Sequence, residues 1–458
     1  MRELVQGQDQ GDFKNMATSN PFKRILLAPI LVGSRLLVAI LRLTKRGSGT
    51  ALPGLLVNRY FPFAFEALLD QIPNIIVITG TNGKTTTQTI LSSLLSQSPE
   101  VKLLRNSAGA NLRQGILSEL MRQANFFGSL DFTHAVLEVE EATLPRIAKA
   151  LKPKIIAVTN LYRDQLDAYG EIDITEAYIR DGIAQSPMAI AVVNGDDPRT
   201  SRLAEGLGNQ THYVSLPVEY TDSLPYEGET RNTDAIATNI LRAKNIRIND
   251  DLTTSFDVTG QVGNVDLQYH DAQISSPGFF HVYNALTAIT IGKLLNIDDK
   301  KLMQGLTAFE PAFGRGELLV KTDGKKSINY RLLLIKNPAS FTLNLDLLRK
   351  IPRLRLILAI NDNTADSKDV SWLWDSELEL LNKAHIDWVI CTGVRAKDMH
   401  LRLKYAFTEP DHKISTMESI QSAIDLSFEQ AADGDTVCVM PTYTSMLEFR
   451  KLMGLMLN

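Results

Sequence analysis

One stretch of the chain decides the fold: Ile75-Ile-Val-Ile-Thr79-Gly80-Thr-Asn-Gly-Lys-Thr-Thr86. Its first five residues form a short apolar and β-branched run, which is typical of a buried strand. The polar run that follows contains two glycines and precedes a helical pattern at 87–96. A strand, a glycine-containing turn and a helix in this order predict a loop whose backbone N–H groups face a bound phosphate.

The side chains of this loop also suit a nucleotide. Lys84 would neutralise the β- and γ-phosphates, and the Thr85 hydroxyl would ligate magnesium. The general phosphate-loop pattern has a glycine five residues before Gly83, whereas this chain has Ile78 there. A plain glycine-containing turn is the alternative, and the order Gly-Lys-Thr argues against it. We therefore expect nucleotide contacts from Gly80, Thr81, Asn82, Gly83, Lys84, Thr85 and Thr86.

The surrounding pattern predicts an α/β fold with a mostly parallel sheet. Short apolar runs alternate with longer helical stretches, as in sheets covered by helices. Four such runs are clear, at 75–79, 135–139, 155–159 and 189–193. Residues 200–275 contain short alternating stretches separated by Asn, Asp, Gly and Pro, which predict an antiparallel or irregular lobe. A helix at about 281–295 returns to the main pattern.

A second α/β series begins near residue 320. Its expected strands lie at 331–335, 354–360, 388–392 and 436–440. The boundary between the two series is expected between Glu317 and Ser327. The sequence thus predicts a helical or flexible N-terminal extension at 1–46, a central phosphate-binding domain at 47–320 and a Rossmann-like C-terminal domain at 321–458.

The composition is that of an ordinary soluble protein. Of the 458 residues, 44% are hydrophobic, and 48 basic against 52 acidic side chains give a net charge of -4. This charge offers no electrostatic case for binding nucleic acid. The two cysteines, Cys391 and Cys438, lie inside apolar runs, so neither a disulfide framework nor a thiolate metal site is expected. A reducing cytoplasm fits this cysteine usage best.

The segment from Ile25 to Leu43 is apolar but does not fit a transmembrane helix. It contains Pro29, Arg35 and Arg42, whereas a membrane span needs about 20 residues with few or no charges. No small-residue cleavage site of a signal peptide follows it. We expect a helical region without a transmembrane segment, whose basic and apolar character permits peripheral contact with a membrane.

Polar clusters follow the predicted strands, where ligands bind in open α/β sheets. Glu138 lies at the end of the second strand, and its carboxylate opposite Thr85 would suit magnesium, which takes oxygen ligands. A solvated acidic strand end is the alternative. Asn160 ends the third strand and leads to a polar run at 163–170. The cluster Asn194-Gly-Asp-Asp197 is also compatible with a plain turn.

Together these motifs resemble the Mur ligase superfamily, whose central domain carries Gly-Thr-Asn-Gly-Lys-Thr, a magnesium glutamate, Thr-Asn followed by Asp-x-Leu-Asp, and Asn-x-Asp-Asp. Phe280-His-Val-Tyr-Asn284 is similar to the segment that holds the adenine-contacting Asn, and Phe313-Gly-Arg315-Gly-Glu317 to the Gly-Arg-x-Glu motif. The resemblance implies ATP and magnesium as cofactors. It implies nucleotide contacts from Asn160, Asn284 and Arg315, and catalytic roles for Lys84 and Glu138.

Within this superfamily the sequence looks most like the MurT-type subunit of lipid II isoglutaminyl synthase. The likeness rests on Asp164-Gln-Leu-Asp-x-Tyr-Gly170, Lys336-Asn-Pro338, the run from Asn361 to Asp375, Gly393-Val-Arg-Ala396 and the run from Leu401 to Ala406. Two departures stand out. Many MurT-like proteins carry a four-cysteine zinc ribbon, whereas residues 200–250 contain no cysteine, so zinc should be absent. His281 stands where the family commonly has Asn.

The resemblance implies an ATP-dependent carbon–nitrogen ligase of peptidoglycan biosynthesis. Such an enzyme activates the α-carboxylate of D-glutamate in the lipid II stem peptide as an acyl phosphate, which ammonia converts to D-isoglutamine. The ammonia would come from a GatD-type class I glutaminase in a heterodimer. Asp369 best matches the acid that the family lends to the partner's Cys-His pair, with Asp362, Asp366 and Asp375 as neighbours. We expect a cytoplasmic protein whose N-terminal segment permits work at the inner face of the membrane.

Other readings of these features stay open. The acids around Asp369 could belong to an ordinary exposed loop, although Trp372 and Trp374 beside them favour an interface. A stand-alone ligase of the folylpolyglutamate synthase type would take its nucleophile directly. Gln165 and Lys336 count against it, because such ligases usually have His at both positions. A nucleotide-dependent interaction protein is the alternative of another class, and the combined magnesium, adenine and arginine motifs argue against it.

Overall fold

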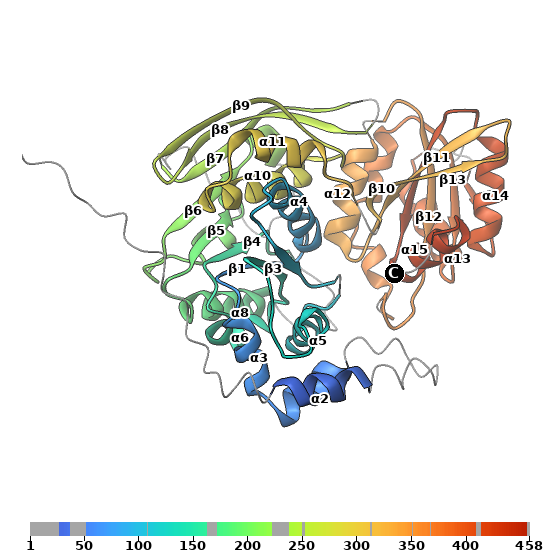
Figure 1. Cartoon of the computed structure of the whole chain (residues 1–458). Helices are drawn as coiled ribbons and strands as arrows, with labels where there is room; N and C mark the ends of the chain where they lie inside the picture. The colour runs from blue at the N-terminus through green and yellow to red at the C-terminus, as the bar shows by residue number, and fades with distance from the viewer. Residues whose placement is uncertain are drawn as a thin grey trace, which may run out of the picture.

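The computed structural model describes residues 27–36, 52–107, 109–162, 172–221, 238–249, 252–311, 314–349, 351–366, 368–408 and 414–455. Within these residues the chain forms two α/β bodies, each built on its own sheet (Figure 1). The motif expected at 163–170, Phe313 and most of the N-terminal extension lie outside the described residues. In the described part of the chain, no helix combines the length and the apolar character needed to cross a membrane.

The first sheet has nine strands in the order β2-β3-β1-β4-β5-β6-β7-β8-β9. Their bounds are β1 Asn74–Thr79, β2 Leu103–Arg105, β3 His134–Glu138, β4 Ile155–Val158, β5 Ile190–Asn194, β6 Thr211–Ser215, β7 Ile240–Ile248, β8 Thr254–Val262 and β9 Val265–Ile274. Neighbours from β2 to β7 pair in parallel, and the last three strands pair antiparallel. The predicted α/β class with a mostly parallel sheet is confirmed.

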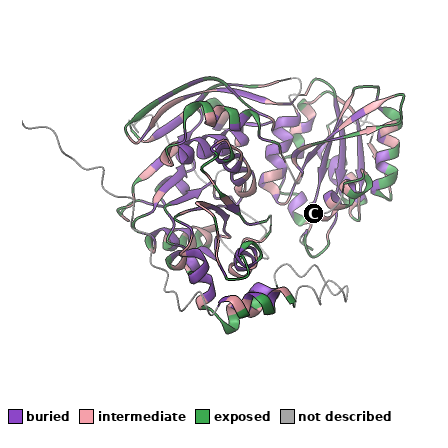
Figure 2. Ribbon diagram, viewed as in Figure 1, coloured by how far each residue is buried: buried purple, intermediate pink, exposed green. Residues whose placement is uncertain are grey.

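Helices cover both faces of this sheet, because its central strands are apolar on both sides (Figure 2). In β1, Ile76 and Ile78 belong to the same core as α4 (Lys84–Ser96), α10 (Phe279–Leu294) and α11 (Asp299–Thr307). Ile75 and Val77 point to the opposite face, as the alternation of a strand requires. That second core is completed by α2 Leu52–Tyr60, α3 Phe63–Leu69, α5 Arg113–Gln123, α6 Leu144–Leu151 and α8 Ile172–Ala184.

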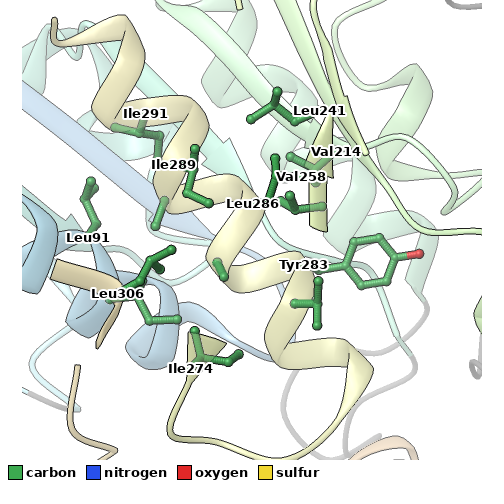
Figure 3. Packing of buried hydrophobic residues seen from close by; sticks show 14 of the residues in the cluster. Leu91, Val214, Leu241, Val258, Ile274, Tyr283, Leu286, Ile289, Ile291 and Leu306 are labelled. Atoms are coloured by element: carbon green, nitrogen blue, oxygen red, sulfur yellow. The ribbon is translucent and has the colours of Figure 1, made fainter. Parts of the chain in front are cut away.

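Helix α10 is buried on nearly all sides, and this fixes its position. Leu286 and Ile289 are fully buried. Figure 3 shows them among Leu91, Val214, Leu241, Val258 and Leu306, which come from α4, the sheet and α11. A helix that is apolar all round can be stable only inside a core. Polar residues in its first turns are therefore held in place as firmly as the core itself.

Residues 200–275, expected as an antiparallel or irregular lobe, extend the first sheet. β6 continues the parallel pairing from β5, and β7, β8 and β9 add an antiparallel meander at its edge. The meander buries Phe256 and Val258 in the core that includes α10. The alternating pattern predicted antiparallel strands, but it did not show that α10 would cover their apolar face and so join them to the central sheet.

The second sheet has six strands in the order β10-β11-β15-β12-β13-β14. The strands are β10 Arg315–Thr322, β11 Ser327–Leu333, β12 Leu354–Ala359, β13 Ile386–Thr392, β14 Ile414–Thr416 and β15 Thr436–Pro441. Helices α12 (Pro338–Leu348) and α13 (Ala396–Ala406) cover one face, and α14 (Ile420–Gln430) and α15 (Tyr443–Leu452) cover the other. The change of sheet falls between Thr307 and Arg315, before the boundary expected from the sequence, because β10 pairs with β11.

We predict that His212 makes stability depend on pH. His212 on β6 is fully buried, and neither ring nitrogen has a hydrogen-bond partner among the described residues. Burial lowers the pKa of His212 from 6.5 to about 4. Between these two pH values the imidazole is protonated in the unfolded chain and neutral in the folded chain. Stability should therefore fall as the pH drops from 6.5 towards 4, by between about 1 and 3 kcal/mol.

Urea unfolding at neutral pH and near pH 5 measures this effect, with His212→Leu expected to show a smaller loss than the wild type. Asp197, whose pKa burial raises to about 6, contributes a change of opposite sign, but it does so in every variant. His270→Leu, at an exposed position, is the control. An unchanged pH dependence in His212→Leu would contradict the prediction.

Candidate active site

The loop between β1 and α4 has two positions that only glycine fits. Gly80 and Gly83 have φ values of +116° and +89°, a region that other residues rarely adopt. A Cβ on Gly80 would lie 2.5 Å from Thr159 Oγ1, and one on Gly83 would lie 2.5 Å from Asn284 Oδ1. The two glycines therefore allow the loop to pack directly against the end of β4 and the start of α10.

Thr159 and Asn160, which follow β4, hold the shape of this loop. Thr159 Oγ1 donates to Asn82 O at 2.6 Å, and Asn160 Nδ2 donates to the same oxygen at 3.0 Å. Asn160 Oδ1 accepts from Asn82 N at 2.9 Å, and Thr81 N donates to Asn160 O at 3.0 Å. Both ends of the Asn160 amide thus bond to the loop backbone, which places this residue as a support of the loop.

Lys84 forms a buried ion pair at the start of α4. Its Nζ donates to Glu141 Oε1 at 2.8 Å and also bonds to the carbonyl of Gly80. The two charged side chains are only 13% and 7% exposed. Because buried charges need compensation, Glu141 stabilises the ammonium of Lys84 within the loop. A triphosphate that binds the loop would compete with Glu141 for the same ammonium.

Thr85 and Glu138 bring two oxygen donors together beside Lys84. Thr85 Oγ1 donates to Glu138 Oε2 at 2.7 Å. Asn106 fixes this glutamate through its backbone, since Asn106 Oδ1 accepts from Glu138 N at 2.9 Å and Asn106 Nδ2 donates to Glu138 O at 2.8 Å. A hydroxyl and a carboxylate at this spacing are hard oxygen ligands, the type that magnesium prefers.

Helix α10 contributes an amide and a neutral imidazole. Asn284 Oδ1 accepts from Thr87 Oγ1 at 3.1 Å, which ties α10 to α4. Asn284 Nδ2 lies 3.5 Å from His281 Nδ1. Burial, together with the nearby charge of Arg315, lowers the pKa of His281 to about 3. The imidazole is therefore neutral at physiological pH.

The second body reaches the same loop through the residues after β11. Lys336 Nζ donates to Thr81 O at 2.9 Å, and the side-chain amides of Asn337 and Asn82 approach to 3.4 Å. Asn337 also caps α12, because its Oδ1 accepts from Ser340 N. The loop is thus enclosed by residues from both sheets.

These groups line one cavity of about 710 Å³ between the two bodies. The described lining residues include Thr81 to Thr86, Glu138, His281, Asn284, Arg315, Lys336, Ala365 and Tyr443. Burial lowers the pKa of Arg315, and the carboxylate of Glu138 opposes this shift, so the guanidinium remains a cation beside the magnesium-type donors. A cavity of this size with convergent polar groups suits a small-molecule ligand, and its cations, among them Lys84, Arg315 and Lys336, suit polyphosphate.

Family models and curated relatives agree on the same assignment. Residues 78–292 match the model "Mur ligase middle domain", and residues 334–446 match "MurT ligase C-terminal". The lipid II isoglutaminyl synthase (glutamine-hydrolyzing) subunit MurT of Staphylococcus aureus is 30% identical, over 87% of this chain and 91% of that protein. Its counterpart in Streptococcus pneumoniae is 29% identical, over 90% of this chain and 94% of that protein.

The chain belongs to the MurT family. Solved structures of other Mur ligases share its fold. MurF from Acinetobacter baumannii superposes with a TM-score of 0.64 at 17% identity, covering 89% of this chain and 80% of MurF. MurF from Thermotoga maritima in complex with ADP gives a TM-score of 0.60 at 15% identity, covering 86% of this chain and 84% of that ligase. The family resemblance expected from the sequence is confirmed.

In this MurT-family chain, most of the predicted site residues lie at the cavity, and one lies away from it. Thr81 to Thr86, Glu138, Asn284 and Arg315 line the cavity, whereas Gly80 and Asn160 stand behind them as parts of the loop and its support. Asp369 lies apart, in an exposed loop of the second body. In the described residues, no group of three or more His, Cys, Asp or Glu side chains could hold a metal ion.

The sequence does not predict the contacts of Glu141 and Lys336 with the loop, and it leaves the role of the 194–197 cluster open. Glu141 was visible beside Glu138, but its pairing with Lys84 depends on the turn after β3. The sequence motif Lys336-Asn-Pro does not predict the contact of Lys336 with Thr81, because this contact crosses between the two bodies. The acids of the 194–197 cluster are structural. Asp196 accepts from Tyr283 Oη at 2.6 Å, and Asp197 accepts from Leu161 N at 3.0 Å.

We predict that Gly83→Ala weakens nucleotide binding by at least about tenfold, because the new Cβ would displace Asn284 from the loop. Calorimetric titration with ADP measures the affinity. Gly206→Ala is a matched control, since Gly206 also has a positive φ, +74°, but a Cβ there would meet nothing within 4 Å. Equal ADP affinities for Gly83→Ala and the wild type would contradict the contact between loop and helix as the cause.

Proposed function

We propose that this chain is the synthetase subunit of a lipid II isoglutaminyl synthase. It would use ATP to activate the α-carboxylate of D-glutamate in the lipid II stem peptide for amidation by ammonia. The observation that carries this proposal is one cavity in which Lys84, Arg315 and Lys336 meet the Thr85–Glu138 pair. The names of the MurT relatives, which are about 30% identical over 87% and 90% of the chain, support the same substrate.

The proposed chemistry proceeds in two balanced steps. In the first, a carboxylate oxygen attacks the γ-phosphorus of ATP and the bond to the β-phosphate oxygen breaks, which yields an acyl phosphate and ADP. In the second, the ammonia nitrogen attacks the acyl carbon, inorganic phosphate leaves and the nitrogen loses a proton. The product is the primary amide of D-isoglutamine. The protein mainly positions the reactants and compensates charge.

The cations of the cavity have distinct proposed tasks. Lys84 exchanges Glu141 for the β- and γ-phosphates, and Arg315 stabilises charge on the γ-phosphoryl oxygens. Lys336 reaches the loop from the second body through the carbonyl oxygen of Thr81. Thr85 and Glu138 fit magnesium as hard oxygen ligands, and the ion would supply charge neutralisation between the phosphates. Asn284, through the resemblance, is assigned to the adenine base.

We predict that Lys84→Ala abolishes ATP turnover, because Lys84 is the cation that α4 itself presents to the loop and no other residue of α4 is basic. A coupled assay of ADP release measures this. The matched control is Lys149→Ala, which removes an exposed lysine on α6 and should leave turnover unchanged. Substantial ATP hydrolysis by Lys84→Ala would refute the assignment of the loop.

The chain itself does not supply a glutaminase nucleophile. Cys391 and Cys438 are both buried in strands of the second sheet, and burial raises the pKa of each thiol to about 12. Neither would form the thiolate that glutamine hydrolysis requires. We therefore propose that ammonia comes from a separate GatD-type class I glutaminase. The words "glutamine-hydrolyzing" and "subunit" in the relatives' names support such a complex.

We assign to Asp369 the role of the acid that serves the partner, and its surroundings support this choice over Asp362 and Asp366. Asp366 is buried and accepts from Thr444 N at the start of α15, and Asp362 pairs with Arg395 at 2.6 Å. Asp369 is exposed, and hydrogen bonds from the Ser371 side chain and from Ser371 N lower its pKa and keep the carboxylate charged. A charged, exposed carboxylate can orient the imidazole of a Cys-His pair on another chain.

The surroundings of Asp369 fit an interface that is connected to the cavity. Trp374 is half exposed and packs its ring 5.6 Å from that of the exposed Tyr405. Aromatic rings of this kind are enriched at interface centres. Ala365, four residues before Asp369, lines the cavity. The same loop thus reaches from the proposed ammonia source to the proposed acyl phosphate.

We predict that Asp369→Asn prevents glutamine-dependent amidation by the complex with its glutaminase, while amidation with added ammonium and ATP turnover persist. Mass analysis of the amidated stem peptide and ADP release measure the activities. Asp375→Asn, another exposed acid nearby, is the control and should retain all three. Loss of ammonium-dependent amidation in Asp369→Asn would assign this residue to the ligase reaction instead. Full glutamine-dependent activity of this variant would exclude any role of Asp369 in the glutaminase reaction.

A further inference from the structure

A cluster of apolar side chains is exposed at the N-terminal end of the described chain. Phe126 and Phe127, in the loop after α5, are 66% and 77% exposed. The other members lie on the helix of residues 27–36 and on or beside α2, and they are Val32, Leu36, Leu52, Leu55, Tyr60 and Phe61. We call these eight residues the N-terminal apolar surface. Figure 2 shows α2 with much of its length exposed at one end of the molecule.

Packing holds this surface in a fixed arrangement. A Cβ on Gly54 of α2 would lie only 1.9 Å from Gln114 O, and Gly54 N donates to Ser118 Oγ at 3.0 Å, so α2 lies directly on α5. Arg35 donates to the carbonyl of Ala124, and its guanidinium lies 4.7 Å from the ring centre of Phe126. The exposed side chains therefore project from segments that are anchored to the core.

The sequence that carries most of this surface is rich in basic residues. Residues 14–65 contain Lys14, Lys23, Arg24, Arg35, Arg42, Lys45, Arg46 and Arg59 and no Asp or Glu, although the whole chain has more acids than bases. Arg35 and Arg59 belong to the described part, and Arg59 lies beside Tyr60. Aromatic side chains with Arg35 and Arg59 beside them complement a surface that is apolar inside and anionic at its rim.

We propose that the N-terminal apolar surface docks on an anionic lipid bilayer. Amphipathic segments of this kind insert their apolar side chains at the boundary of head groups and acyl chains, and their cations attract anionic lipids. The exposed Phe rings beside Arg35 have both properties at one site. An acidic protein surface is the alternative occupant, because charges across protein interfaces are complementary, and vesicle binding distinguishes the two.

The position of this surface relative to the cavity would bring the active site close to a lipid-linked substrate. This part of the inference rests on the proposed function. Helix α5 begins at Arg113, two residues after Asn111, which lines the cavity. Figure 1 places α2 beside α5, and their packing through Gly54 agrees. A chain docked through α2 would therefore hold its cavity close to the bilayer, within reach of a stem peptide carried by a lipid.

Vesicle flotation with the full chain tests this proposal. The wild type should bind phosphatidylglycerol-containing vesicles and should bind pure phosphatidylcholine vesicles much less. The double variant Phe126→Ser/Phe127→Ser should bind the anionic vesicles at least about tenfold more weakly. The matched control, Met188→Ser/Val218→Ser, removes two exposed apolar side chains elsewhere and should bind like the wild type. Arg59→Glu should weaken binding, whereas Lys244→Glu, at an exposed position on β7, should not.

The proposal would be overturned if the wild type did not bind anionic vesicles, or if the Phe126/Phe127 variant and its control bound them equally. It would also be overturned by a concentration-dependent dimer that this variant disrupts without any change in vesicle binding. Circular dichroism and ATP turnover in lipid-free solution show whether each variant is folded. The two proposals remain separable. Vesicle binding without ATP turnover would refute the proposed function alone, and turnover without vesicle binding would refute the docking alone.

Discussion

The close packing of the loop after β1 is the constraint on which the rest of the site depends. Gly80 lies against Thr159 at the end of β4, Gly83 lies against Asn284 of α10, and Thr81 accepts a hydrogen bond from Lys336 of the second body. Each contact comes from a different part of the sequence. The shape of the loop therefore rests on contacts with the parallel sheet, with the buried helix and with the second body.

Charge compensation in the cavity follows from the same packing. Lys84 and Arg315 are cations with little exposure, and Glu141 and Glu138 are the carboxylates that face them. Burying either cation alone would be costly, so Glu138 at the end of β3 and Glu141 in the turn after it compensate these charges in the folded chain. A phosphate that replaces Glu141 on Lys84 would meet groups that already point inward, which limits the rearrangement needed on binding.

The second body uses similar residue types for different physical tasks. Asp366 accepts a hydrogen bond from Thr444 N at the start of α15, and Asp362 pairs with Arg395. Asp369 remains exposed to solvent. The cysteines of the same body are packed as small apolar side chains. Residue type therefore does not decide function here. Burial and the available hydrogen-bond partners decide which acid can act outside the chain.

The sequence by itself determined the α/β class, the phosphate-type loop and the family, because apolar periodicity and short motifs are local properties. It also predicted Glu138 beside Thr85, since both lie where parallel strands end at the same edge. Tertiary structure alone decided that β6 to β9 extend the first sheet, that Glu141 pairs with Lys84, that Asn160 braces the loop, and that the acids at 196 and 197 are structural. Those outcomes depend on long-range packing, which places side chains from distant segments within hydrogen-bond distance and leaves no local pattern in the chain.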